Sequence, residues 1–286
     1  MSSISDFVRE RGDLSKILLV SDLDGTLMNR ENDISQENRE AMQEFVDMGG
    51  RFAVCSGRVV ASTEWLKVPM NTPSILHNGG SIYDFNEGKV VWTMPMEETV
   101  RDLLLDLQLH FPETAWTVYT AREHCVLHHN KWSDWLSGIE GCKPSRINCK
   151  LEDVTDPILK FVTPGSPEEI AKVMAYIHDN CDPEVGTLFP GNVSLPTLLE
   201  FTGANSDKGA ALQALAEICH VELSDIIYMG DNMNDYNALK IAGLSVVPES
   251  CHQGVRQLGD YIGVDMDEHL MVDVLNEIKK GLMGKK

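Results

Sequence analysis

Two aspartates, Asp22 and Asp24, directly follow a short apolar run at residues 17–20 and are separated by a single residue. In an extended segment these alternate positions present two carboxylates together, so Asp22 could attack while Asp24 handles protons. Gly25 permits a sharp turn after them, and the Thr26 hydroxyl can hydrogen-bond an anion. These residues suit attack by a carboxylate on an anionic group, provided that positive charge lies nearby.

Polar residues also follow other expected strands, at residues 56–58 (SGR), 78–80 (NGG) and 230–235 (GDNMND). The working residues of open α/β sheets lie just beyond the carboxyl ends of strands, so we expect these segments to meet. Clustered aspartate oxygens without His or Cys suit a hard cation, most commonly Mg²⁺. Lys208, which starts a helix capped by Asp207, supplies positive charge together with the helix N-terminus.

The two ends of the chain are predicted to form one α/β domain with a parallel, Rossmann-like sheet. Short apolar strands alternate with amphipathic helices at both ends, which is typical of a doubly wound sheet. The expected strands lie at 17–20, 51–55, 75–77, 226–229, 244–247 and 261–264, and the expected helices at 36–48, 208–219, 236–242 and 270–282.

The middle of the chain follows a different order, which predicts a separate α+β module inserted into that domain. We expect a discontinuous core at 1–93 and 200–286 and the inserted domain at 94–199. Residues 131–157 are polar and resist assignment. The expected elements of this module are helices at 97–110 and 166–180 and strands at 115–119, 125–128, 158–162, 185–189 and 198–201.

Composition limits the kinds of partner. The 286 residues contain 24 Lys and Arg against 44 Asp and Glu, a net charge of −20, which argues against general binding to nucleic acids or anionic membranes. The seven cysteines form no C-x-x-C pair, and the N-terminus has no apolar signal segment. We therefore expect a soluble, cytoplasmic protein; its oligomeric state is not readable.

Four segments together resemble the motifs of the haloacid dehalogenase (HAD) superfamily, and specifically its Cof-like phosphatase branch. Residues 22–26 match Asp-x-Asp-x-Thr, Ser56 matches the hydroxyl after the second strand, and Lys208 lies in Asp-Lys-Gly. Residues 230–235 match Gly-Asp-x-x-Asn-Asp. Four motifs in the correct order are highly specific. The resemblance implies a large α/β cap between Ser56 and Lys208.

The same resemblance implies roles for individual residues. Asp22 would form an aspartyl-phosphate, and Asp24 would protonate the leaving oxygen and then activate water, with Lys208 as the catalytic cation. Mg²⁺ would be held by Asp22, the backbone carbonyl of Asp24 and Asp231, with support from Asp235. Phosphate or substrate binding is implied for Thr26, Ser56, Gly57, Asn78, Lys208 and Asn234.

We therefore expect a Mg²⁺-dependent phosphatase acting on a small phosphorylated metabolite, either a sugar phosphate or a nucleotide-like cofactor phosphate. A phosphomutase of the same superfamily and a non-catalytic phospho-acceptor or binding module are the alternatives. Related sequences often have Gly-Asn-Ala where this chain has residues 248–250 (PES), so substrate access could differ.

Some residues also have ordinary structural interpretations. Arg58 is expected to be an ion-pair partner rather than a ligand, and Asp235 could cap a helix. Three histidines, His124, His128 and His129, suggest a metal site at first sight. A strand would send the last two to opposite faces, and no carboxylate or cysteine cluster completes a site, so we interpret them as structural.

Overall fold

A computed structural model of the chain describes residues 3–181 and 191–283, and the chain divides into two compact units. The core unit comprises Met1–Trp92 and Asp207–Lys286, and the inserted unit comprises Thr93–Ser206. The second junction lies later than the predicted boundary at residue 200. The reason is that strand β11, Leu198–Thr202, pairs along its whole length with a strand of the inserted unit.

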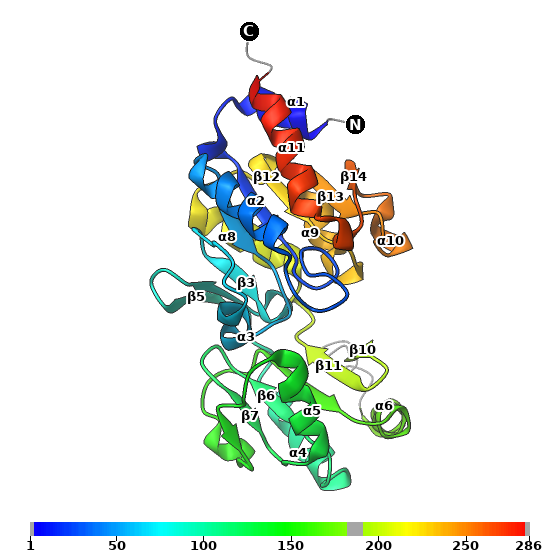
Figure 1. The fold of residues 1–286 in the computed structure, drawn as a ribbon. Coiled ribbons are helices and arrows are strands. Elements are labelled where there is room, and N and C mark those ends of the chain that lie inside the picture. Colours follow the sequence, from blue (N-terminus) through cyan, green and yellow to red (C-terminus); the bar gives the residue numbers. More distant parts are fainter. Residues whose placement is uncertain (1–2, 182–190, 284–286) are drawn as a thin grey trace. The chain divides into compact units, whose positions relative to one another are not determined.

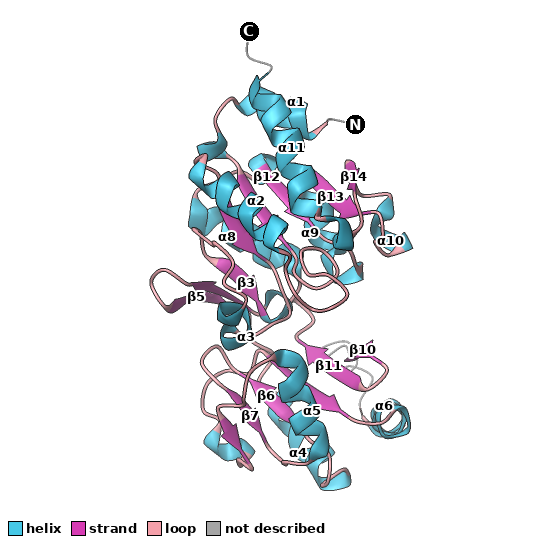
Figure 2. Cartoon of the chain, in the orientation of Figure 1, coloured by secondary structure: helices cyan, strands magenta, loops and turns pink. Residues whose placement is uncertain are grey.

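A five-stranded parallel sheet forms the centre of the core unit, in the order β14-β13-β12-β1-β2. Figures 1 and 2 label β12, β13 and β14 of this sheet. From β1 the chain moves to β2 on one side, whereas β12, β13 and β14 extend the sheet on the other. The strand order therefore reverses at β1, which is where open α/β sheets place their ligands. The strands are β1 Leu18–Ser21, β2 Arg51–Val54, β12 Ile226–Met229, β13 Leu244–Pro248 and β14 Tyr261–Gly263.

Alternating side chains of these strands fill two apolar layers. Leu19 and Ile227 point into a cluster shared with helices α1, α2 and α11, whereas Leu18 and Ile226 point into a cluster shared with α8 and α9. Burial on both faces explains the continuous apolar runs of the sequence. The helices are α1 Ile4–Arg11, α2 Gln36–Asp47, α3 Val60–Trp65, α8 Lys208–Cys219, α9 Tyr236–Ile241, α10 Gln253–Arg256 and α11 Leu270–Met283.

A small antiparallel sheet, in the order β3-β4-β5, continues from the second strand. Ile75 of β3 forms a parallel bridge with Cys55, just beyond β2, so the segment that leads to Asn78 starts beside the main sheet. The strands are β3 Ser74–Leu76, β4 Ser81–Asp84 and β5 Lys89–Thr93.

The inserted unit has a six-stranded mixed sheet in the order β10-β11-β9-β6-β7-β8. One face packs on helices α4 and α6 through an apolar cluster that includes Leu104, Val118 and Phe161. The expected strand at 185–189 lies outside the described residues. The elements are α4 Val100–His110, β6 Thr117–Tyr119, β7 His124–Val126, α5 Lys131–Glu140, β8 Arg146–Ile147, β9 Lys160–Pro164, α6 Pro167–Asn180 and β10 Gly191–Leu195.

The predicted fold class, a Rossmann-like parallel sheet with an inserted α+β domain, is confirmed. Helix α5 lies within the stretch that resisted assignment, and its start is marked by a reciprocal cap between Asn130 and Ser133. Helix α1 was also missed, although Ile4, Phe7 and Val8 have helical spacing and are buried. In the described ranges, no helix is both long and apolar enough to cross a membrane.

Candidate active site

The backbone after β1 places the first two aspartates in different surroundings. The N–H of Asp22 donates to the Met229 carbonyl at 2.8 Å, which continues the pairing of β1 with β12 and holds the residue beside the end of both strands. Its Oδ1 accepts from the Leu23 N–H at 2.8 Å. The side chain of Asp22 is buried, whereas that of Asp24 is 53 % exposed. One carboxylate is therefore fixed inside the site and the other lies at its surface.

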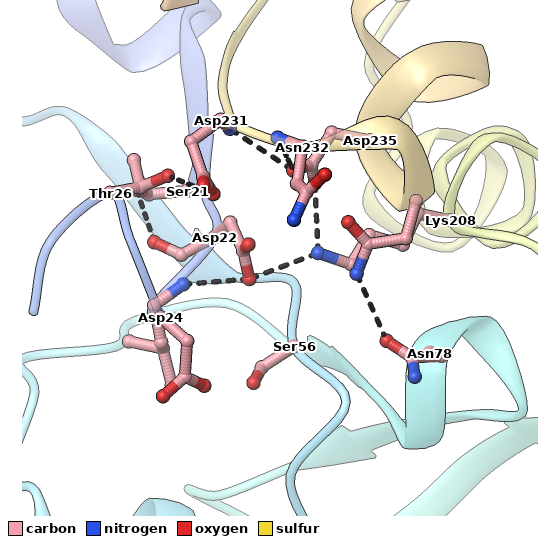
Figure 3. Close-up of polar contacts among 12 residues, drawn as sticks. Ser21, Asp22, Asp24, Thr26, Ser56, Asn78, Lys208, Asp231, Asn232 and Asp235 are labelled. Atoms are coloured by element: carbon pink, nitrogen blue, oxygen red, sulfur yellow. Dashed lines mark hydrogen bonds and ion pairs between the residues drawn. The ribbon is translucent and has the colours of Figure 1, made fainter. Parts of the chain in front are cut away.

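Lys208 occupies the centre of the site and connects two carboxylates from distant parts of the chain. Its ammonium lies 3.0 Å from Asp22 Oδ1 and 2.8 Å from Asp235 Oδ1, and its side chain is 0 % exposed. Figure 3 shows the lysine reaching between them. Asp207 caps helix α8 by accepting from the Gly209 and Ala210 N–H groups, which fixes Lys208 as the first residue of the helix.

Asp235 is held by four hydrogen bonds, two to each carboxylate oxygen. Oδ1 accepts from Lys208 and from the Tyr228 hydroxyl, both at 2.8 Å. Oδ2 accepts from the N–H groups of Asp231 and Asn232, both at 3.1 Å. Asp235 therefore orients the lysine and the loop after β12 at the same time, which is more than the helix-capping role considered from the sequence.

Asp231 projects from that loop toward the turn after β1. Its Oδ1 accepts from the Thr26 hydroxyl at 3.2 Å. Gly25 has a φ of +82°, and an added Cβ would lie 2.4 Å from Asp231 Oδ2, so the turn needs glycine for both its conformation and its space. The Asp22-to-Thr26 turn and the loop after β12 are thus packed directly against each other.

The charges of this cluster are not balanced. Asp22, Asp231 and Asp235 each offer an oxygen within 4.8 Å of the others, against the single ammonium of Lys208. Burial raises the pKa of Asp22 well above its usual range; Lys208 opposes this rise, and the neighbouring carboxylates add to it. Burial and Asp235 raise the pKa of Asp231 to about 6.

For the pKa of Lys208, the neighbouring charges outweigh the effect of burial. Burial alone would lower its pKa, but Asp22 and Asp235 outweigh burial and hold the pKa above its usual value, so the lysine stays charged. Three carboxylates and one ammonium leave an excess of two negative charges in a buried, all-oxygen site. Such a donor set fits a hard divalent cation such as Mg²⁺, which would relieve the repulsion that raises the carboxyl pKa values.

Arg58 makes the ion pair that was predicted for it, and its partner is Asp24. The guanidinium binds the carboxylate through two bonds, Nη2 to Oδ1 at 2.7 Å and Nε to Oδ2 at 3.0 Å. A bidentate pair of this kind fixes the orientation of the carboxylate as well as neutralising it. Arg58 therefore positions the residue that is predicted to transfer protons.

The remaining predicted residues lie on the segments after β2 and β3. The buried Ser56 accepts from the Arg58 N–H at 3.2 Å through its hydroxyl. An added Cβ on Gly57 would lie 2.8 Å from Asn78 Oδ1, so these two segments are in close contact. Asn78 in turn accepts from Asn234 Nδ2 at 3.4 Å. The structure thus gathers these residues on adjacent segments of the core unit.

Tyr228 is a buried site residue that sequence reasoning missed. It was interpreted only as part of an apolar strand, yet its hydroxyl donates to Asp235. The signal was present in the sequence: a tyrosine in the middle of a fully buried strand needs a partner for its hydroxyl. The segment that follows residues 248–250 contacts the site, because the His252 N–H donates to the Asp231 carbonyl at 2.8 Å.

The chain is also similar to known proteins. Residues 19–275 match the haloacid dehalogenase-like hydrolase family. Two Bacillus subtilis relatives, both named 5-amino-6-(5-phospho-D-ribitylamino)uracil phosphatases, are 26 % and 27 % identical, covering 91 % and 88 % of this chain and 97 % and 92 % of their own. A crystal structure from Thermotoga maritima superposes with a TM-score of 0.80 at 23 % identity, covering 91 % of this chain and 96 % of its own.

Proposed function

Since the chain belongs to the haloacid dehalogenase-like hydrolase family, we propose that it is a Mg²⁺-dependent phosphatase that hydrolyses a small phosphorylated metabolite. The observation that carries the proposal is the pairing of the buried Asp22 with Lys208 at 3.0 Å, beside two further carboxylates. A nucleophilic carboxylate must approach an anionic phosphoryl group, and this requires positive charge at the same place.

The proposed first step forms a bond between an Asp22 oxygen and phosphorus. The bond from phosphorus to the leaving oxygen breaks, and Asp24 donates a proton to that oxygen, so the product alcohol leaves neutral. The Leu23 N–H and Lys208, which both contact Oδ1 of Asp22, orient the nucleophile for this attack. Arg58 orients Asp24 as a carboxylate through two bonds, and when Asp24 carries the proton, one of these bonds is released while the other keeps the orientation.

The proposed second step releases inorganic phosphate. Asp24, now deprotonated, takes a proton from a water molecule, and the resulting oxygen attacks phosphorus and expels Asp22 as a carboxylate. Lys208 stabilises negative charge during both steps. Mg²⁺, when bound by Asp22, the Asp24 carbonyl and Asp231 with support from Asp235, supplies further charge neutralisation. Thr26, Ser56, Gly57, Asn78 and Asn234 are proposed to contact the phosphoryl group or the substrate around it.

The names of two relatives support a narrower proposal for the class of substrate. Both Bacillus relatives are named for a substrate in which a phosphorylated ribityl chain is attached to a pyrimidine. We propose a substrate of this chemical kind, a primary phosphate on a polyol chain that carries a heterocycle; of the two classes expected from the sequence, a sugar phosphate and a nucleotide-like cofactor phosphate, it is nearer to the second. The inserted unit is the proposed source of selectivity for the organic part.

The test is a phosphate-release screen over sugar phosphates, nucleotides and the ribitylamino-pyrimidine phosphate, with Mg²⁺ and with chelator. Asp22→Asn is expected to abolish turnover without loss of fold. Asp47→Asn, the same change on an exposed carboxylate at the end of α2, is the matched control and should be fully active.

Each outcome has a separate meaning. Turnover retained by Asp22→Asn would refute the nucleophile, and turnover in chelator would refute the metal requirement. Activity that depends on an added bisphosphate, without net phosphate release, would identify a phosphomutase instead.

A further inference from the structure

A second group of metal-ligating side chains lies in the inserted unit. His124 of β7, Glu140 at the end of α5, and Cys142 each offer one ligand atom, and these atoms all lie within 4.8 Å of one another. The sequence argument that no carboxylate or cysteine accompanies His124 is therefore wrong. Helix α5 returns the chain to the sheet, which brings together residues that the sequence separates.

His128 and His129, by contrast, take no part in this group. Strand β7 ends at Val126, so strand alternation does not govern the two histidines. His128 lies 3.6 Å from Glu113 and His129 lies 2.9 Å from Asp134, so each pairs with a different carboxylate. Only His124 faces the group.

The backbone explains why Glu140 and Cys142 both reach the same place. Gly141, between them, has a φ of +68° and ends helix α5 in the left-handed conformation. Glu140 is further held by the Tyr119 hydroxyl, which donates to its Oε1 at 2.7 Å. Both side chains therefore converge on one side of a fixed turn rather than on a loose loop.

His124 supplies the observation that points to a ligand. The residue is only 7 % exposed, and its Nε2 is buried without a hydrogen-bond partner among the described residues. A buried polar atom without a partner costs free energy, so such an atom calls for an explanation. The ring is fixed in place by stacking on Tyr119, with centroids 5.5 Å apart and an angle of 13° between planes.

The charges around the group allow a cation to bind. Lys160 is the nearby positive charge, but it pairs with Glu200 at 2.9 Å, so the two together add no net charge. Burial, with a smaller effect from Lys160, lowers the pKa of His124 to about 4, which leaves the ring neutral at physiological pH. A carboxylate, a thiolate and a neutral imidazole together carry two negative charges, which a divalent cation neutralises.

We propose that His124 Nε2, the Glu140 carboxylate and the Cys142 thiolate bind a divalent transition-metal ion of the Zn²⁺ type. This mixed nitrogen, oxygen and sulfur donor set suits a borderline metal, whereas the oxygen cluster of the core unit suits Mg²⁺. Zinc–ligand distances of about 2.0–2.3 Å place ligand atoms about 3.5 Å apart, so binding draws the three groups closer by small side-chain rotations. The thiol proton is released to solvent on binding.

The test uses Co²⁺ as a spectroscopic probe for Zn²⁺ and the full-length chain in excess Mg²⁺. A thiolate bound to Co²⁺ gives a sulfur-to-metal charge-transfer band in the near ultraviolet, which the all-oxygen cluster of the core unit does not give. We expect this band to saturate at one equivalent of Co²⁺ and to be displaced by Zn²⁺.

Conservative variants decide the outcome. Cys142→Ser should abolish the band, and Glu140→Gln should weaken Co²⁺ binding about tenfold. Cys181→Ser, a partly buried cysteine elsewhere in the same unit, should bind as the unchanged protein does. Absence of the band from the unchanged protein, or its persistence in Cys142→Ser, would overturn the proposal.

Discussion

Replacing Asp235 by Asn tests the central claim that this buried carboxylate organises the site. Asn keeps the shape of the side chain but replaces one accepting oxygen with a donating NH₂ group. The NH₂ group must then face either Lys208 and Tyr228 or the N–H groups of Asp231 and Asn232. Since the ammonium has no accepting capacity, the amide oxygen should stay with Lys208, and the two backbone N–H groups lose their acceptor.

The size of the effect follows from these contacts. With an effective dielectric constant of about 20, the attraction of Asp235 to Lys208 over 2.8 Å is worth about 6 kcal/mol. Repulsion from Asp22 and Asp231, no more than 4.8 Å away, is worth at least about 3.5 kcal/mol each, so it offsets the attraction to Lys208 in the metal-free chain. The N–H groups of the half-buried Asp231 and the exposed Asn232 lose their acceptor, and because water reaches them in part, the cost lies near the lower end of about 1–3 kcal/mol each. We expect a loss of about 2 kcal/mol.

This loss is measured by unfolding the protein with urea in the presence of chelator. Hydrogen exchange of the β1 and β12 amides is the readout, because it reports on the core unit alone. The matched control is Asp13→Asn: this exposed carboxylate also accepts a backbone N–H, from the exposed Ser15 at 2.9 Å, so water can replace it. The control should change the free energy of unfolding by less than about 1 kcal/mol. If Asp235→Asn costs no more than Asp13→Asn, our account of Asp235 is wrong.

Three further predictions concern neighbouring parts of the site. Gly25→Ala should destabilise the core unit by about 1–3 kcal/mol and weaken Mg²⁺ binding, because φ is +82° and the new methyl group would meet Asp231. Calorimetry measures both the stability and the Mg²⁺ affinity. An unchanged Mg²⁺ affinity would contradict the prediction. Arg58→Lys should lower kcat about tenfold with little change in KM, because Lys cannot hold Asp24 through two bonds. An unchanged kcat in steady-state assays would show that the bidentate ion pair between Arg58 and Asp24 is not needed. In chelator, the free energy of unfolding should rise as pH falls from about 6 to about 4, because the pKa of Asp231 is about 6 in the folded chain and about 3.9 when unfolded, so the folded chain binds the proton more tightly. Asp22, whose pKa is also raised, adds to this rise, so Asp231→Asn should reduce the rise in urea titrations without removing it. Saturating Mg²⁺, which binds the charged carboxylates, should oppose the rise.

The site was largely predictable because its residues follow strands that the sequence marks clearly. Continuous apolar runs identified β1 and β12, and parallel strands of one sheet end at the same edge, so Asp22 and Asp231 could be expected to meet. The pairing of Arg58 with a carboxylate was also foreseen, although the identity of that carboxylate, Asp24, was not. Several exposed acidic residues could have paired with Arg58. The path of the turn after β1 determines that Asp24 is the partner, and the periodicity of the sequence does not predict that path.

The features that were missed depend on contacts between distant segments. Tyr228 looks like any apolar strand residue until its hydroxyl is seen beside Asp235. The grouping of His124 with Glu140 and Cys142 depends on helix α5, whose short, polar-flanked sequence gave no clear period. Helix α1 is short, and its stability comes from packing on α11, a partner at the other end of the chain.

The central position of β1 has a consequence for how the chain folds during synthesis. Leu18 pairs with Arg51 on one side but with Ile226 on the other. While the ribosome is still producing the intervening segment, one edge of β1 stays without its neighbour, and such an edge is a template for pairing with other chains. We therefore expect premature termination before β12 to yield aggregation-prone fragments.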